Sequence, residues 1–147
     1  MSELLARIQR DALAARKAQE RAASLLLGTL LSEMKNKEIE LRRALTDEDA
    51  VDVVRKALKR RREAVEAFTK GARPELAERE ANEASALEAY LPPAIDPAEV
   101  RAAVRAAIEG GATAIGAVMG KVVPRFKGQV DGAVLSAIVK EELAAPR

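Results

Sequence analysis

Residues 88–97 read EAYLPPAIDP, and this stretch decides how the chain is organised. No helix can cross Pro92–Pro93, because proline has no backbone N–H and its ring clashes with the preceding turn. Asp96–Pro97 has the form of an N-cap followed by a first helical residue, so a new helix is expected to begin there. The stretch therefore predicts a helical bundle subdomain over residues 1–91 and a smaller subdomain over residues 92–147.

The composition on both sides of this boundary favours helices. Alanine, leucine, glutamate, arginine and lysine dominate, 33% of the residues are charged and only 2% are aromatic. The dominant residues are strong helix formers, whereas the β-branched and aromatic residues that strands prefer are few. We therefore expect an all-α protein, with an N-terminal antiparallel four-helix bundle-like subdomain followed by a small three-helix subdomain.

Capping residues, prolines and glycines mark the expected helix boundaries of the first subdomain. Between these marks, apolar residues recur at helical spacing, as at Leu27, Leu30 and Met34. The first expected helix starts after Ser2, and the second spans about residues 22–43. The third runs from a capping box at Thr46 and Asp49 to about Lys70, where Gly71 ends it, and the fourth starts near Pro74.

Three short helices are expected in the second subdomain. The last of them has Val134, Leu135 and Ile138 in its apolar stripe. The expected boundaries are Asp96 to Gly110–Gly111, then about 113–126 with an interruption or end near Pro124, then a turn at Lys127–Gly128 and a third helix after Asp131.

The absence of two residue types narrows the chemistry open to this chain. It has no cysteine, which excludes disulfides and thiolate metal sites, and no histidine, the commonest general base and metal ligand. Its few serines and threonines therefore lack the base that nucleophilic catalysis needs. The N-terminus has no apolar signal-peptide core, and the uncharged residues 110–120 are too few to span a membrane. We expect a soluble cytoplasmic protein with no cofactor, no metal and no enzymatic activity of its own.

Four ionisable side chains fall inside the apolar stripes of the first subdomain when its helices are drawn as helical wheels: Asp11, Glu38, Arg61 and Glu83. One interpretation is a carboxylate metal site, but bundle sites of this kind use histidines, and Arg61 puts a cation where the metal would sit. The other is a buried ion-pair network in which Glu38 or Glu83 pairs with Arg61. We favour the network, because a buried guanidinium needs a carboxylate partner.

Six cations and no acid occur within residues 55–62. One interpretation is a patch that faces the phosphates of a nucleic acid. The other is a solvated helix face, with i,i+4 partners in Asp52 and in Glu63 or Glu66. The net charge of +2 does not support the first interpretation, and the sequence alone favours the second. The candidates for nucleic-acid contacts in this run are Lys59, Arg60 and Arg62.

A second group of cations lies in the last subdomain, in the run MGKVVPRFKGQVDG at residues 119–132. The run does not match a P-loop, because it has no Gly-Lys-Ser/Thr ending. On the simplest interpretation Gly128 and Gly132 serve the turn and the cations keep the surface hydrated. No aromatic residues are interleaved to stack on unpaired bases, so a nucleic acid would be contacted through its backbone and shape. The cations are Lys121, Arg125 and Lys127.

The order and spacing of these motifs resemble the YqeY family along essentially the whole chain. The resemblance is carried by MKNKEIE at residues 34–40, LKRRRE at 58–63, EAYLP at 88–92 and the segment from MGKV to VDG at 119–132. That family is similar to the C-terminal tail of GatB, the B subunit of the glutamine-dependent aminoacyl-tRNA amidotransferase. Its fold would be a helical bundle followed by a small three-helix subdomain. The chain departs from the family at Leu27–Gly28, where Leu-Arg is usual, so no role of that arginine carries over.

The resemblance implies a tRNA-related role, because the amidotransferase tail helps to grip the body of the tRNA. It does not imply catalysis, since the carbon–nitrogen ligase chemistry with glutamine as amido-N-donor belongs to other domains of that enzyme. By this resemblance Lys121, Arg125 and Lys127 are the first candidates for RNA contact. An aminoacyl-tRNA synthetase or an amidotransferase is a candidate partner. The alternative is a protein–protein interaction adaptor that uses the same helical scaffold without RNA.

Overall fold

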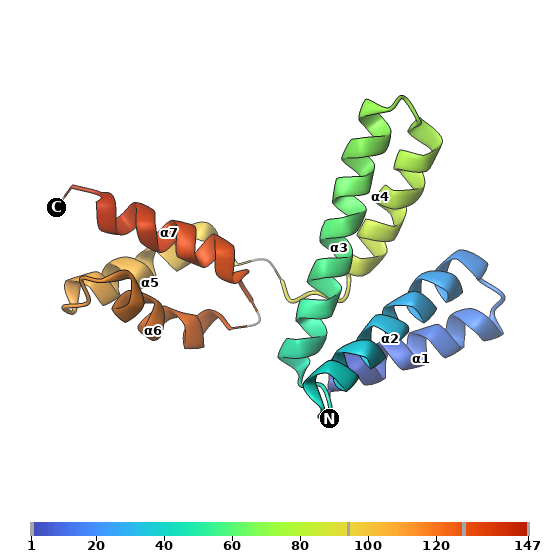
Figure 1. Cartoon of the computed structure of the whole chain (residues 1–147), viewed down its shortest axis with the longest axis horizontal. Coiled ribbons are helices and arrows are strands. Elements are labelled where there is room, and N and C mark those ends of the chain that lie inside the picture. The colour runs from blue at the N-terminus through green and yellow to red at the C-terminus, as the bar shows by residue number, and fades with distance from the viewer. Residues whose placement is uncertain (1, 94, 128, 147) are drawn as a thin grey trace. The chain divides into compact units, whose positions relative to one another are not determined.

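The computed structural model describes residues 2–93, 95–127 and 129–146, and these residues form α-helices and no strand (Figure 1). The predicted all-α fold class is therefore confirmed. The helices of the described residues are α1 (Glu3–Lys17), α2 (Arg21–Leu41), α3 (Asp47–Lys70), α4 (Pro74–Glu88), α5 (Pro97–Glu109), α6 (Ile115–Phe126) and α7 (Gly132–Ala144). The chain divides into two compact units, Met1–Leu91 and Pro92–Arg147.

Hydrogen bonds to capping side chains confirm the predicted starts of α1, α3, α5 and α7. In the capping box of α3, the Thr46 hydroxyl accepts from the N–H of Asp49, and the Asp49 carboxylate accepts from the N–H of Thr46. These bonds satisfy N–H groups that have no partner inside the helix. Pro74 and Pro97 each begin a helix. Side-chain N-caps are also provided by Ser2, Asp96 and Asp131.

Some boundaries differ from the prediction. Gly71 ends α3 as its C-cap with φ −82°, and the left-handed residue is the following Ala72, with φ 55°. Pro124 lies inside α6 without ending it, because its ring removes a single hydrogen bond close to the helix end. Gly132 is the first residue of α7 and not part of the turn. The predicted turn residue Gly128 lies outside the described residues.

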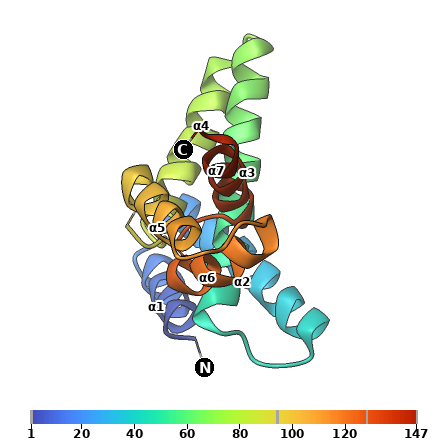
Figure 2. The same cartoon turned by 90° about the vertical axis from the view of Figure 1, so that its left-hand side faces the viewer.

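The first unit consists of two helical hairpins. α1 packs against α2, and α3 packs against α4 along its length (Figures 1 and 2), while α1 and α2 also contact α3. Every buried residue of α3 lies between Ala50 and Leu58, so the second half of this helix extends beyond the common core. The hairpins therefore share a core at one end and do not pack as four helices along their whole length. That core includes Ile8, Leu26, Leu27, Leu30, Met34, Leu45, Val53, Val54, Leu58 and Leu87.

The second unit has a core of small aliphatic side chains. Each of its helices α5, α6 and α7 packs against the other two. Val104, Val118 and Val139 are completely buried. Phe126 is the aromatic residue of this core. Val134 is 51% exposed, although the sequence placed it in the apolar stripe of the last helix. It lies at the edge of that stripe, in the first turn of α7, where no neighbouring helix covers it.

The left-handed backbone at Ala72 predicts that Ala72→Gly stabilises the first unit. This conformation costs alanine about 1–2 kcal/mol and glycine very little. Because glycine is also more flexible in the unfolded chain, we expect a net gain of about 0.5–1 kcal/mol in the free energy of unfolding, measured with urea. The control Ala81→Gly, in the middle of α4, should lose about 1 kcal/mol. A loss in both variants would contradict the prediction.

Candidate nucleic-acid interface

Two of the arginines predicted as RNA contacts within residues 55–62 form ion pairs between helices. Arg60 Nη2 lies 2.6 Å from the Glu33 carboxylate on α2. Arg62 Nη2 lies 2.5 Å from the Glu88 carboxylate on α4. The partners therefore come from neighbouring helices and not, as predicted, from i,i+4 positions on α3 itself. These arginines connect α3 to its neighbours, and a phosphate would have to compete with Glu33 or Glu88 for them.

Lys59, the third candidate in this run, is exposed, and its side chain forms no ion pair within the described residues. Glu66, one of the predicted same-helix partners of the run, pairs instead with Lys70 at 2.9 Å. Both side chains of that pair are mostly exposed, so it contributes little to stability. Of the three α3 candidates, Lys59 is thus the one that folding leaves open to an anionic partner.

The predicted pairing of Arg61 with Glu83 is confirmed, but the four groups form separate, partly buried contacts and not one buried network. Arg61 Nε lies 2.8 Å from Glu83 Oε2 and 3.7 Å from Glu80 Oε2, and 18% of the Arg61 side chain is exposed. Asp11 accepts a hydrogen bond of 2.6 Å from the Tyr90 hydroxyl instead of pairing with an arginine. Glu38 is half-buried and forms no ion pair within the described part of the chain. The helical wheel overstated the burial of Arg61, because the buried residues of α3 end at Leu58.

Sequence reasoning missed the contact between α1 and the residues that follow α4. The Tyr90 hydroxyl bonds to Asp11, and the guanidinium of Arg7 lies 4.8 Å from the centre of the Tyr90 ring. Arg7 Nη2 also donates to the carbonyl oxygen of Ala89 at 3.4 Å. Burial, followed by the hydrogen bond to Asp11, raises the pKa of Tyr90 above its ordinary value, so the phenol stays protonated. One feature of the sequence pointed to this contact: Tyr90, the only tyrosine of the chain, directly precedes Leu-Pro-Pro at the boundary between the subdomains.

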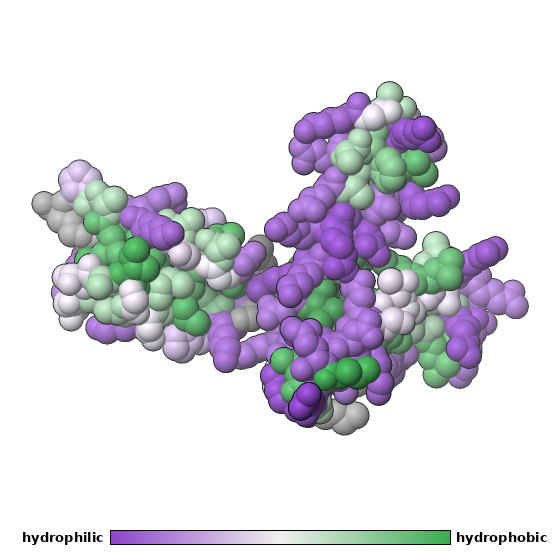
Figure 3. Space-filling view, in the orientation of Figure 1, coloured by the Kyte–Doolittle hydropathy of each residue, from purple (hydrophilic) through white to green (hydrophobic). Residues whose placement is uncertain are grey.

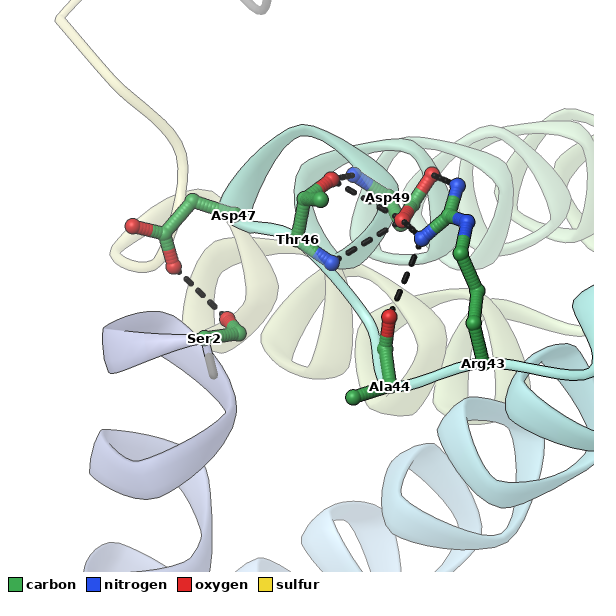
Figure 4. Close-up of polar contacts among 6 residues, drawn as sticks. All are labelled: Ser2, Arg43, Ala44, Thr46, Asp47 and Asp49. Carbon is green, nitrogen blue, oxygen red and sulfur yellow. Dashed lines mark hydrogen bonds and ion pairs between the residues drawn. The ribbon is translucent and has the colours of Figure 1, made fainter.

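A second polar cluster joins the start of α1 to the start of α3 (Figure 4). Ser2 Oγ donates to Asp47 Oδ1 at 2.7 Å, and the N–H of Leu4 donates to the same oxygen at 3.1 Å. Arg43 Nη1 lies 2.6 Å from Asp49 Oδ2. The hydrogen bond from Ser2 lowers the pKa of Asp47, and the one from Arg43 lowers the pKa of Asp49. These carboxylates are bound within the fold, and the cluster holds the two helix starts together.

The most buried carboxylate described in the second unit was also missed. Glu142 on α7 is 5% exposed and accepts from Arg105 Nε at 2.8 Å and from Arg101 Nη1 at 3.1 Å, both on α5. The hydrogen bond from Arg105 is the main cause that lowers the pKa of Glu142. Two features of the sequence pointed to this contact: Arg101 and Arg105 lie four residues apart, and Glu142 falls inside the last apolar stripe. Both arginines thus connect α5 to α7 within the unit.

The cations of α6 remain on the surface. Lys121 and Arg125 lie four residues apart on the helix, Lys127 follows its end, and all three are exposed. Arg125 is 58% exposed and lies 4.0 Å from the equally exposed Glu99, a pair that contributes little. A Cβ added at Gly110 would lie 3.7 Å from Lys121 Nζ, which places this ammonium beside the C-terminal end of α5, where the helix dipole favours a cation. We call Lys121, Arg125 and Lys127 the cationic edge of α6.

A groove of about 830 Å³ lies between α2 and α4 in the first unit. Leu25 and Leu26 contribute to its apolar lining, and Leu25 is 64% exposed. Because its polar lining has both signs of charge, the groove suits a peptide or protein better than a polyanion. The polar lining residues are Arg21, Glu75, Glu78, Arg79, Asn82 and Glu83.

Neither a metal centre nor a membrane span is found in the described part of the chain. No group of three histidine, cysteine, aspartate or glutamate residues there could hold a metal ion. No described helix is both long enough and apolar enough to cross a bilayer. The candidate binding surfaces of the described residues are Lys59 on α3, the groove between α2 and α4, and the cationic edge of α6.

A family model described as Yqey-like protein matches residues 5–143, which is nearly the whole chain. The matched range contains every motif that carried the resemblance and every candidate site residue. No curated protein matches the sequence.

The contacts of Arg61 predict that Arg61→Ala lowers the free energy of unfolding by about 1–3 kcal/mol, because partly buried Glu83 and Glu80 lose their cation. Thermal and urea denaturation measure the change. Lys59→Ala removes an exposed cation of the same run and should change stability by less than about 0.5 kcal/mol. Wild-type stability of Arg61→Ala would show that the pairing does not support the fold.

The lowered pKa values of Asp47 and Asp49 predict a loss of stability in acid. A carboxyl whose folded pKa lies below its unfolded value of about 3.9 stabilises the fold above that pH, and the contribution is lost as the pH falls through the folded pKa. Asp49→Asn should therefore cost about 1 kcal/mol at pH 7, from the capping box and the Arg43 pair, and less at pH 3. An equal difference from wild type at both pH values, measured in urea, would contradict this.

Proposed function

The chain belongs to the YqeY family, and from that premise we propose that it is a tRNA-binding module that catalyses no reaction by itself. It would serve aminoacyl-tRNA metabolism as an accessory, alone or beside an aminoacyl-tRNA synthetase or an amidotransferase. The similarity of this family to the GatB tail supports the proposal, because that tail grips tRNA while the chemistry lies in other domains. The chain also lacks the histidine and cysteine on which most acid–base and nucleophilic catalysis depends.

The observation that carries the proposal is the exposed cationic edge of α6. Lys121, Arg125 and Lys127 lie within seven residues, and α6 itself contains no acid. In α3, Arg60 and Arg62 lie 2.6 Å and 2.5 Å from carboxylates of neighbouring helices, whereas Arg125 lies 4.0 Å from Glu99. A phosphate backbone that meets the cationic edge gains favourable charge contacts and releases its counterions. Lys59 is a secondary candidate on the same reasoning.

The RNA contacts are expected to be to phosphate and ribose groups. The three aromatic side chains of the protein are poorly placed for stacking: Phe126 is 2% exposed, Phe68 is half-buried, and Tyr90 is engaged by Asp11 and Arg7. Recognition without stacking depends on backbone contacts and on the shape of the RNA. Such binding is strongly salt-dependent.

Binding to total tRNA at two salt concentrations tests the proposal. We expect micromolar or tighter binding by the wild type at low salt, with a steep slope of log K against log salt. In the variant Lys121→Ala/Arg125→Ala/Lys127→Ala the slope should fall by about 2–3, since each lost phosphate contact is worth about 0.7–0.9.

The matched control is Lys17→Ala/Lys35→Ala/Lys56→Ala, which removes the same charge from exposed positions of the first unit. It should bind tRNA with nearly the wild-type slope. No binding by the wild type at low salt would contradict tRNA binding, and equal weakening in both triple variants would contradict the assigned surface.

A second candidate function, the protein-interaction adaptor, is favoured by the apolar surface of α2. Leu25 and Ile39 are 64% and 66% exposed, and Leu25 also lines the groove between α2 and α4. Large apolar side chains this exposed are common at protein-binding surfaces. A single protein partner whose binding resists salt and is lost in Leu25→Asp, with no tRNA bound, would favour the adaptor. Leu13→Asp, at an exposed leucine of α1 outside that groove, is its control.

A further inference from the structure

The groove between α2 and α4 contains a leucine that the first unit leaves largely uncovered. Leu26 is 6% exposed and belongs to the core, whereas its neighbour Leu25 lines the groove and is 64% exposed. In the space-filling view, white and green side chains gather on the α1–α2 hairpin where it faces the α3–α4 hairpin, in contrast to the purple surface along α3 (Figure 3). A large apolar side chain exposed in a concave surface indicates an occupant.

Most charged side chains that line this groove are not used by the fold. Arg21 is the first residue of α2, and Glu75, Glu78 and Arg79 belong to the first two turns of α4. All four are exposed, and none of them forms an ion pair within the described residues. The remaining charged residue of the lining, Glu83, pairs inside the unit. The groove therefore presents charges of both signs to an occupant.

The distribution of these charges makes the groove complementary to a second copy of itself. The lining residues of α2 include Arg21 and no acid, whereas those of α4 include Glu75 and Glu78, of which Arg79 offsets one. The α2 side of one molecule and the α4 side of another therefore attract each other. A two-fold axis forms this contact twice, because an isologous interface pairs residue i with j and j with i.

The start of α2 has the two properties that an occupant of this groove needs. Arg21 and Leu25 are four residues apart, so a cation and an exposed leucine lie on the same side of the helix. We infer that two copies of the chain associate through the groove, with the start of α2 of each copy in the groove of the other. Leu25 is then buried in the contact, and Arg21 lies beside Glu75 and Glu78 of the other copy. This association goes beyond the proposed tRNA binding and does not depend on it.

Analytical ultracentrifugation of the whole chain measures the association. The α2 residues of the lining lie between Arg21 and Leu26, so the contact is small, and we expect a weak dimer with a Kd on the order of 100 µM. The concentrations should extend from about tenfold below to about tenfold above that value. Leu25→Asp should weaken the dimer at least about tenfold without lowering the melting temperature, because the side chain is exposed in the monomer. Leu13→Asp, at an exposed leucine of α1 outside the groove, is the control and should dimerise as the wild type does.

Charge reversal tests whether the occupant is a second copy. Arg21→Glu places acids opposite Glu75 and Glu78 in its own dimer, and Glu75→Arg/Glu78→Arg places cations opposite Arg21, so each variant alone should dimerise at least about tenfold more weakly than the wild type. In an equal mixture, the introduced acid faces the introduced cations and the native Arg21 faces the native glutamates. The mixed dimer should therefore recover an affinity close to that of the wild type. Arg10→Glu, at an exposed arginine of α1 outside the groove, should have no effect.

Three results would overturn the inference. A wild-type chain that stays monomeric at every concentration would leave the groove to a different protein. A dimer that Leu25→Asp and both charge variants leave intact would form through another surface. Charge variants that dimerise weakly and are not restored by mixing would show that Arg21 does not face Glu75 and Glu78 of the other copy.

Discussion

In both units, arginines of one helix reach carboxylates of a neighbouring helix, and we attribute the specificity of helix packing to these ion pairs. The cores are built mainly from alanine, valine and leucine, with one large aromatic residue fully buried. Small aliphatic side chains of similar shape can repack with little loss of burial. The pairs Arg61–Glu83 and Arg105–Glu142 are formed only when their helices lie in one register. A partly buried charge left unpaired is costly, so each pair disfavours the alternative registers.

This use of arginine determines which cations remain for binding. Arg60 and Arg62 look like a phosphate-binding patch in the sequence, but Glu33 and Glu88 compete for them in the fold. On α6, Lys121 and Arg125 are exposed. Within the described residues, the carboxylate that pairs with Arg125 is that of Glu99, at 4.0 Å. The density of positive charge along a sequence is therefore a poorer guide to a binding surface than the carboxylates that fold against it.

Several features could be predicted because their causes are close in sequence. The capping box at Thr46 and Asp49 spans four residues, and two neighbouring residues, Asp96 and Pro97, mark the start of α5. The contact between Tyr90 and Asp11 could not be predicted in this way, because the partners lie 79 residues apart. Glu142 likewise depends on arginines at least 37 residues away. No periodicity or local motif connects such distant positions.

The sequence by itself determined the all-α class, the family and most helix starts, since propensity, capping and proline act on the backbone within a few residues. Only the tertiary structure decided that the first unit is a pair of hairpins with a core at one end, that Arg60 and Arg62 connect helices, and that Asp11 binds a tyrosine. It also decided that Leu25 is exposed beside a groove while Leu26 is buried. The physical reason is that a side chain's exposure and partner depend on which helix lies beside it. That choice is made by the packing of the whole unit and not by any one segment.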